Sequence, residues 1–185
     1  IYGGSNSKGT VRASGTLSIA KPSTGTCPMK IGSVYGGGNQ AAGAAVALSI
    51  GCTGTTDEDT GITTVFGGAN AANITGDILL NITEGKIANV YGGNNSSGSI
   101  SGTITVNIEK AANPCIWNIG NVYGGGKLAP YGDADHNKGN YPVVNIKNGT
   151  VSGSVFGGGF GSTAVVYGNP QVTIGHATEG YDADV

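Results

Sequence analysis

The residues best suited to bind a metal ion lie in a long insertion that ends before Val144. Asp133, Asp135 and Asn137 alternate there with other residues. Alternating oxygen ligands of this kind open a calcium-binding loop, in which successive side chains converge on one hard cation. The pattern then departs from such a loop, because Lys138 stands where glycine is needed and Val144 where a bidentate glutamate closes the site. Two interpretations stay open, a calcium site and a solvated turn.

Cysteine pairing is the second chemistry that the sequence suggests. Cys27, Cys52 and Cys115 each lie in a long loop. The first two belong to adjacent repeats, and a short loop separates Cys115 from them. We therefore predict a Cys27–Cys52 disulfide, with three free thiols as the alternative. No C-x-x-C pair is present, and this argues against a zinc site.

Catalytic groupings are not evident in the sequence. Glycoside hydrolysis requires two carboxylates across the scissile bond, whereas the acidic residues here fall in different repeats and no pair recurs in register. His136 has no Ser or Cys partner at an interpretable spacing. The glycine clusters lead into strands instead of the helix N-terminus that a phosphate-binding loop needs. We expect no enzymatic activity.

A row of aromatic residues offers a candidate ligand-binding surface. Each member follows a valine or isoleucine and precedes two glycines. If the strand stays regular, the rings form an outward stripe that stacks on sugars. If the chain bends at the aromatic, the rings cover a corner and stack on one another, and we prefer this second interpretation because a long exposed aromatic band promotes association. The row comprises Tyr2, Tyr35, Phe66, Tyr91, Tyr123 and Phe156.

The spacing of this row determines the predicted architecture. Successive aromatics are separated by 33, 31, 25, 32 and 33 residues. Self-similarity with a period of about 20–50 residues is typical of repeat proteins, whose cores grow by stacking one unit on the next.

Three short strands are predicted in each repeat. An upstream pair of apolar residues two positions apart indicates the first strand, and a small polar residue stands between them. A second strand ends at the aromatic. A third, weaker strand is marked by an apolar residue six positions before the first pair, a row that Lys138 breaks. The pairs are Leu17/Ile19, Leu48/Ile50, Leu80/Ile82, Val106/Ile108, Val144/Ile146 and Val172/Ile174, and the weaker row is Val11, Ala42, Ile74, Ile100 and Val166.

These strands predict an all-β fold, a parallel β-helix of about six coils. Parallel crossovers are right-handed in about 98% of cases, so we expect a right-handed helix. Because the chain starts and stops within a repeat, we expect residues 1–185 to be a single segment of a longer array. Unpaired terminal strands would then favour end-to-end self-association.

Composition excludes two classes of partner. Charged residues make up 11% of the chain, the net charge is −2, and Arg12 is the one arginine. Nucleic-acid binding requires clustered Lys and Arg, so it is not expected. No apolar run approaches the roughly 20 residues of a membrane span.

The motif Val34-Tyr35-Gly36-Gly37-Gly38-Asn39, which recurs in degenerate form along nearly the whole chain, resembles the repeat regions of large adhesin-like surface proteins of bacteria. The resemblance implies a secreted or cell-surface module without catalysis, whose partners are a host surface or glycan and the neighbouring repeats of its own chain. No cofactor other than calcium is suggested. The alternative is a carbohydrate-processing β-helix, a polysaccharide lyase or glycoside hydrolase, with its catalytic coils outside this segment.

Overall fold

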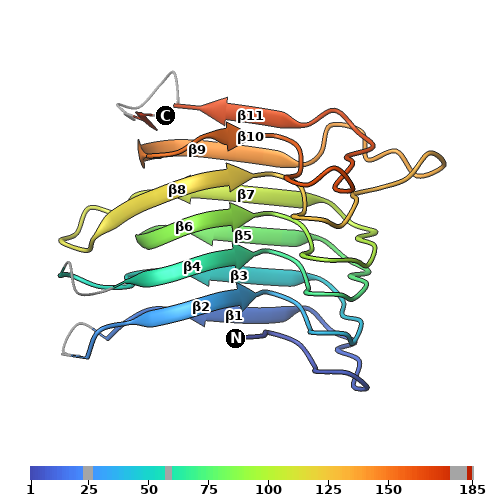
Figure 1. Cartoon of the computed structure of the whole chain (residues 1–185), viewed down its shortest axis with the longest axis horizontal. Helices are drawn as coiled ribbons and strands as arrows, with labels where there is room; N and C mark the ends of the chain where they lie inside the picture. Colours follow the sequence, from blue (N-terminus) through green and yellow to red (C-terminus); the bar gives the residue numbers. More distant parts are fainter. Residues whose placement is uncertain (23–26, 57–59, 176–182, 185) are drawn as a thin grey trace.

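The computed structural model describes residues 1–22, 27–56, 60–175 and 183–184. These residues form β-strands and no helix, so no helical membrane span is found among them. Every pair of neighbouring strands is parallel. Figure 1 shows the strands stacked one above another, with loops projecting sideways from the stack at both ends of the strands.

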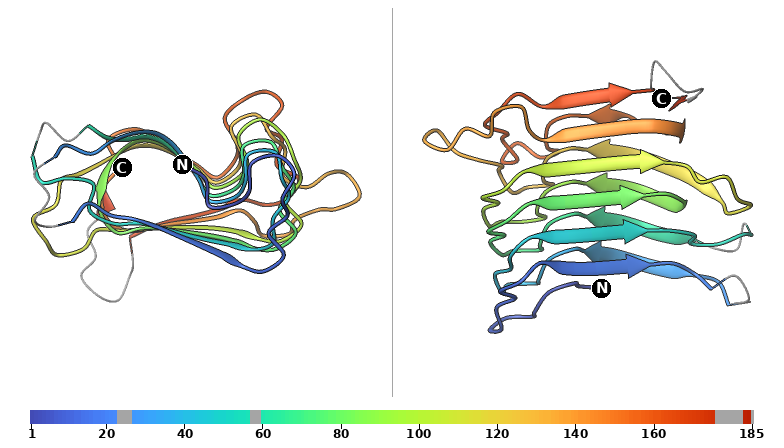
Figure 2. Two further views of the ribbon diagram at one scale, coloured as in Figure 1. Left: turned by 90° about the horizontal axis from the view of Figure 1, so that it is seen from below. Right: turned by 180° about the vertical axis from the view of Figure 1, so that it is seen from behind.

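Consecutive strands from β1 to β11 alternate between two sheets. The first sheet has the order β1-β3-β5-β7-β9-β11, with β12 pairing to β9, and the second has the order β10-β8-β6-β4-β2. Each strand therefore pairs with its equivalent in the next repeat, as in a parallel β-solenoid. The coils superimpose when the stack is viewed from below (Figure 2). The first sheet contains β1 (Gly15–Ile19), β3 (Val46–Ile50), β5 (Ile78–Ile82), β7 (Ile104–Glu109), β9 (Val143–Thr150), β11 (Gln171–Ile174) and β12 (Ala183–Asp184). The second contains β2 (Lys30–Tyr35), β4 (Gly61–Phe66), β6 (Gly85–Tyr91), β8 (Trp117–Tyr123) and β10 (Val155–Phe156).

The core consists of rows of like side chains, as the repeat spacing predicts. Leu48 pairs in register with Leu17 on one side and with Leu80 on the other. The side chains of Leu48 and Leu80 are 0% exposed. Each such burial contributes about 1.5–3 kcal/mol relative to an exposed side chain. Polar residues between the apolar pairs form their own row outside, where Asn145 donates to Asn107 and Asn107 to Asn81.

The prediction of a third strand in each repeat was wrong, because the structure has only isolated β-bridges at this position. Single residues pair at this corner, such as Ile74 with Ile100. In the second repeat the bridging residue is Gly43 instead of Ala42, and in the fifth it is Tyr131, which pairs with Val166. The row that Lys138 was predicted to break is therefore continued by Tyr131.

Close backbone approach explains why this corner cannot hold a regular strand. A Cβ atom added at Gly102 would lie 2.3 Å from the carbonyl carbon of Gly76. Side chains are excluded at these positions, and the chain turns between the sheets after one bridging residue.

Candidate functional site

The aromatic row forms a continuous stack at the C-terminal ends of the strands of the second sheet. Neighbouring rings have centroid separations of 4.7–5.0 Å and interplanar angles of 2–13°. The spacing matches the distance between paired strands because each ring sits on equivalent positions of successive coils. The prediction that the rings stack on one another is confirmed.

Stacking decides what this row can bind. Phe66, Tyr91 and Tyr123 are 2%, 4% and 8% exposed, and each has a ring on both faces. Phe160 adds an edge contact to Tyr91 and Tyr123, with centroids 6.3 and 5.5 Å away. A sugar ring therefore finds no open ring face at these three residues, and the row is structural there. Tyr35 likewise lies between two rings, and Phe156 is 45% exposed.

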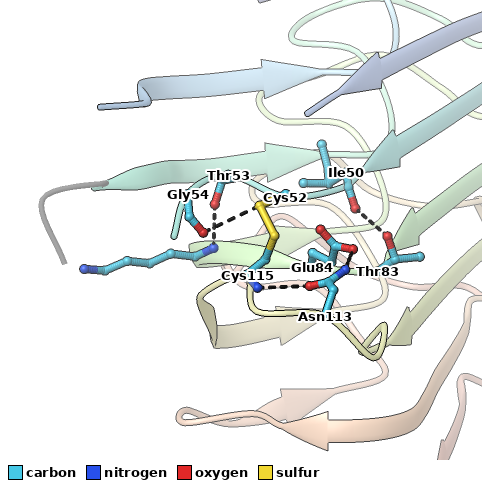
Figure 3. The surroundings of a disulfide bond; sticks show 9 residues. Ile50, Cys52, Thr53, Gly54, Thr83, Glu84, Asn113 and Cys115 are labelled. Carbon is cyan, nitrogen blue, oxygen red and sulfur yellow. Dashed lines mark hydrogen bonds between the residues drawn. A yellow bond between two sulfur atoms is a disulfide. The ribbon is translucent and has the colours of Figure 1, made fainter. Parts of the chain in front are cut away.

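The disulfide prediction was wrong in its partner. Cys52 is bonded to Cys115, and Cys27 is exposed and free (Figure 3). The two bonded cysteines lie in loops of the second and fourth repeats, 63 residues apart in sequence.

The short loop of the intervening repeat makes this pairing possible. Only Thr83 and Glu84 lie between β5 and β6. The longer loops on either side close over this gap, where the backbone N–H of Ile116 donates to the Gly54 carbonyl oxygen at 2.9 Å. The short loop is therefore the opening through which the two cysteines meet and not, as predicted, a barrier between them.

Two of the three calcium ligands predicted in the insertion, Asp133 and Asn137, accept hydrogen bonds within their own loop. Asp133 Oδ1 accepts hydrogen bonds from the backbone N–H groups of Asp135 at 3.0 Å and His136 at 2.8 Å. His136 Nδ1 lies 2.8 Å from the same oxygen, and this contact is the largest cause lowering the pKa of Asp133. Asn137 Oδ1 accepts from the backbone N–H of Gly139 at 2.8 Å. These contacts are those of a closed turn, and calcium binding stays a prediction.

The insertion also forms one side of a polar groove. It projects beyond the neighbouring turns between β8 and β9 (Figures 1 and 2). A groove of about 800 Å³ lies between this loop and the segment 96–101. Ser97, Ser99 and Ser101 line it from one side, and Asp133 and His136 from the other.

Two anchors hold the insertion over the groove. The buried Tyr131 donates its hydroxyl to the Gly102 carbonyl oxygen at 2.9 Å. Lys138 Nζ donates to the Ser101 carbonyl oxygen at 2.8 Å and lies 5.2 Å from the centre of the Tyr131 ring. Burial lowers the pKa of Lys138, and the charge of Asp133 opposes this effect. The lysine is thus a tether of the loop.

The groove presents polar side chains that can form hydrogen bonds with a ligand. His136 and Asp133 form an acid–base pair, but their side chains are 76% and 61% exposed. Within the described part of the chain, no hydrogen bond links His136 to a serine hydroxyl, as an activated nucleophile requires. The hydroxyls of Ser97, Ser99 and Ser101 likewise have no partner among the described residues and are available to a ligand.

Several residues of the groove, the aromatic row and the disulfide were not predicted from the sequence in these roles. The alternation of Ser97, Ser99 and Ser101 is a period-two signal that a strand-like segment exposes on one side. Phe160 stands where other repeats carry Asn39 or Asn70, so its contact with the aromatic row could have been suspected. The pairing of Cys52 with Cys115 had no signal in the sequence.

Comparison with protein-family models, with curated proteins and with solved structures finds no match. The likeness of the repeat motif to bacterial surface proteins therefore remains a hypothesis that rests on the residues alone.

Proposed function

We propose that this chain is an extracellular structural and adhesive module of a bacterial surface protein. In this proposal it is one segment of a longer right-handed β-helix, with about six of the coils in residues 1–185. The coils set the reach of the module, and its loops and polar rows meet a host surface or glycan. The module itself carries out no catalysis.

The observation that carries the proposal is the unbroken stacking of like residues through the repeats. The aromatic stack runs from Tyr2 to Phe156 without a gap, and in the first sheet a leucine and valine row runs from Leu17 to Val172. Each coil contacts mainly its neighbours, so such a stack can extend to any length. This is the property that a spacer at a cell surface needs.

The Cys52–Cys115 disulfide supports an extracellular location. Disulfides persist in secreted and surface proteins and are rare in reducing compartments. A link between the second and fourth repeats also holds three coils together against fraying.

The groove beside the insertion supports an adhesive role. Three serine hydroxyls and the Asp133–His136 pair offer hydrogen-bond donors and acceptors on both walls. Lys138 lines the groove, and its Nζ already donates to the Ser101 carbonyl oxygen. A neutral polyhydroxylated ligand fits this set of groups better than an anionic one.

A glycan array probed with the protein tests the proposal. We expect binding that weakens when Ser97, Ser99 and Ser101 are all changed to alanine. The matched control replaces the exposed Ser7, Ser14 and Ser18 instead. A reducing-end sugar assay then follows on each bound glycan. Binding without turnover agrees with the proposal, whereas turnover would favour the carbohydrate-processing alternative, and an array without any hit would contradict adhesion to glycans.

Two further expectations have simple tests. End-to-end self-association predicts a mass that rises with concentration in light scattering, and a monodisperse monomer would contradict it.

Calcium binding by Asp133, Asp135 and Asn137 predicts a lower Tm after a chelator is added. An unchanged melting curve would rule out this loop as a calcium site.

A further inference from the structure

Three side chains able to bind a metal ion converge where the loops of the second and fourth repeats meet. The sulfur atoms of Cys52 and Cys115 and a carboxylate oxygen of Glu84 all lie within 4.8 Å of one another. All three residues are partly buried, and Figure 3 shows them side by side. Among the described residues, no other group of His, Cys, Asp and Glu converges in this way. We call these residues the Cys–Glu–Cys cluster.

Backbone contacts hold the cluster together independently of the disulfide. Thr53 Oγ1 accepts a hydrogen bond from the backbone N–H of Lys86 at 2.8 Å, and Thr53 is 0% exposed. The backbone N–H of Ile116 donates to the Gly54 carbonyl oxygen, and that of Gly85 to the Ile116 carbonyl oxygen. Both cysteine loops are thus fastened to the neighbouring strands, and the two sulfur atoms stay near each other when the bond between them opens.

Asn113 orients Glu84, the third residue of the Cys–Glu–Cys cluster. Its side-chain amide donates to Glu84 Oε1, and its Oδ1 accepts the backbone N–H of Cys115 at 3.0 Å. One side chain therefore fixes both the carboxylate and a cysteine loop. Residues that coordinate a metal ion usually receive hydrogen bonds of this kind, which align the ligand and tune its basicity.

We propose that the reduced form of the Cys–Glu–Cys cluster binds a thiophilic divalent cation such as Zn²⁺. Cys52 and Cys115 act as thiolate ligands and Glu84 as the carboxylate ligand, with water in the fourth position. Zn–S distances of about 2.3 Å and Zn–O distances of about 2.1 Å place tetrahedral ligand atoms about 3.5–3.8 Å apart. The cluster reaches this geometry through small side-chain movements.

Reduction by external thiols converts the disulfide form of the cluster into the metal-binding form. Two external thiols are oxidised to one disulfide, and the Cys52–Cys115 bond takes up their two electrons and two protons to give two thiols. The cation then displaces both protons and binds the thiolates, which are the metal-binding form of cysteine. In the oxidised form no thiolate is present. The loops of the second and fourth repeats are therefore linked either covalently or through the metal.

Cobalt(II) titration of the reduced protein tests this proposal. The experiment uses Cys27→Ser, so that the exposed free thiol does not contribute, after treatment with dithiothreitol and its removal without air. We expect a thiolate-to-cobalt charge-transfer band that saturates at one equivalent and disappears when Zn²⁺ is added. The same protein in its disulfide form should show no such band.

Two variants in the Cys27→Ser background assign the ligands. Glu84→Gln should weaken cobalt binding by more than about 100-fold, the upper end of the loss that removal of an outer hydrogen-bond partner causes. Asp77→Asn, which removes a carboxylate from the turn before β5, should leave the affinity unchanged. The absence of the band in the reduced protein, equal binding by the disulfide form, or an unaltered affinity in Glu84→Gln would each overturn the proposal. None of these results bears on adhesion, which the glycan array tests separately.

Discussion

Asn94 shows how a single polar residue can organise a turn of the stack. It is 1% exposed and occupies a position where the other repeats carry serine, glycine or alanine. Its Oδ1 accepts the backbone N–H of Ala69 at 2.7 Å, and its Nδ2 donates to the carbonyl oxygens of Ala72, Ser97 and Gly98. The side chain thus satisfies backbone groups of two successive turns that would otherwise be buried without partners.

Asn94→Ala should lower the free energy of unfolding by about 2–4 kcal/mol, because each buried group left without a partner costs about 1–3 kcal/mol. Asn95→Ala is the matched control. That side chain makes one ladder hydrogen bond, to Asn70, and is partly exposed. Its loss should cost about 0.5–1.5 kcal/mol. Urea unfolding measures both, and equal effects would contradict the role given to Asn94.

Asp77 should make stability depend on pH. Its Oδ1 accepts hydrogen bonds from the backbone N–H and the hydroxyl of Thr103 at 2.7 and 2.9 Å. These bonds lower the pKa of Asp77 below its ordinary value of 3.8, with the backbone bond as the largest cause. The unfolded chain therefore binds the proton more readily, so this contribution is present above pH 3.8 and is lost as the pH falls through the folded pKa.

Asp77→Asn should reduce the loss of Tm between pH 7 and pH 2, because the amide does not titrate. Thermal melts of the wild type and the variant at a series of pH values check this expectation. If the two proteins lose the same number of degrees on acidification, Asp77 does not contribute to acid sensitivity.

At the scale of the element, loop length decides which parts of the stack are fastened together. The short connection between β5 and β6 lets the loops of the flanking repeats meet and form the Cys52–Cys115 bond. In the same way, the long insertion after β8 folds back through Tyr131 and creates the groove. The disulfide and the groove both lie outside the strands, and both depend on which coils carry long loops and which carry short ones.

Cys115→Ser should destabilise the protein by about 2–4 kcal/mol, because a disulfide that closes a long loop restricts the unfolded chain. Cys27→Ser should leave stability unchanged, since Cys27 is exposed and free. Thiol counting on the unfolded, unreduced wild type should give one thiol, that of Cys27. Three thiols would contradict the disulfide.

Tyr91→Ala should cost about 3–5 kcal/mol, the usual loss for a buried aromatic side chain. Tyr91 is 4% exposed and has rings on both faces. Tyr91→Phe should be close to neutral, because Phe66 and Phe156 occupy equivalent positions in other repeats. Urea unfolding and near-ultraviolet circular dichroism compare the variants. A similar loss in Tyr91→Phe would mean that the hydroxyl matters more than the ring stack.

At the scale of the whole molecule, the protein is a linear stack whose hydrophobic core runs through successive coils. Its interior consists of rows that cross every coil, such as Val34, Val65, Val90 and Val122, all 0% exposed. Repeats of different length coexist in this stack because the additional residues leave it as loops. Removing one complete coil should therefore preserve the rest.

Deletion of residues 67–91 joins Phe66 to Gly92 and keeps the order of strands. We expect a cooperatively folding protein whose urea m value falls by roughly one seventh, in proportion to the 25 of 185 residues removed. Deletion of residues 92–116 removes the same number of residues but takes out β7 and keeps β8, so strands no longer alternate between sheets. Both variants are measured under reducing conditions. Cooperative unfolding of the second variant would contradict the stacked architecture.

The repeat spacing by itself determined the parallel strands and the two main rows of core residues, and it favoured the stacked aromatics over an outward stripe. Each of these depends on one periodicity: equivalent positions in successive coils must lie one strand spacing apart. For this reason the prediction that Leu17, Leu48 and Leu80 lie in one row is confirmed by their register.

Only the tertiary structure decided the features that depend on loops. The pairing of Cys52 with Cys115, the substitution of Tyr131 into the third row and the groove beside Ser99 all require knowing where a loop goes after it leaves the stack. A loop has no period, and its path is set by the space that neighbouring coils leave open. For this reason, the fold could be predicted from the residues, whereas the candidate sites required the assembled molecule.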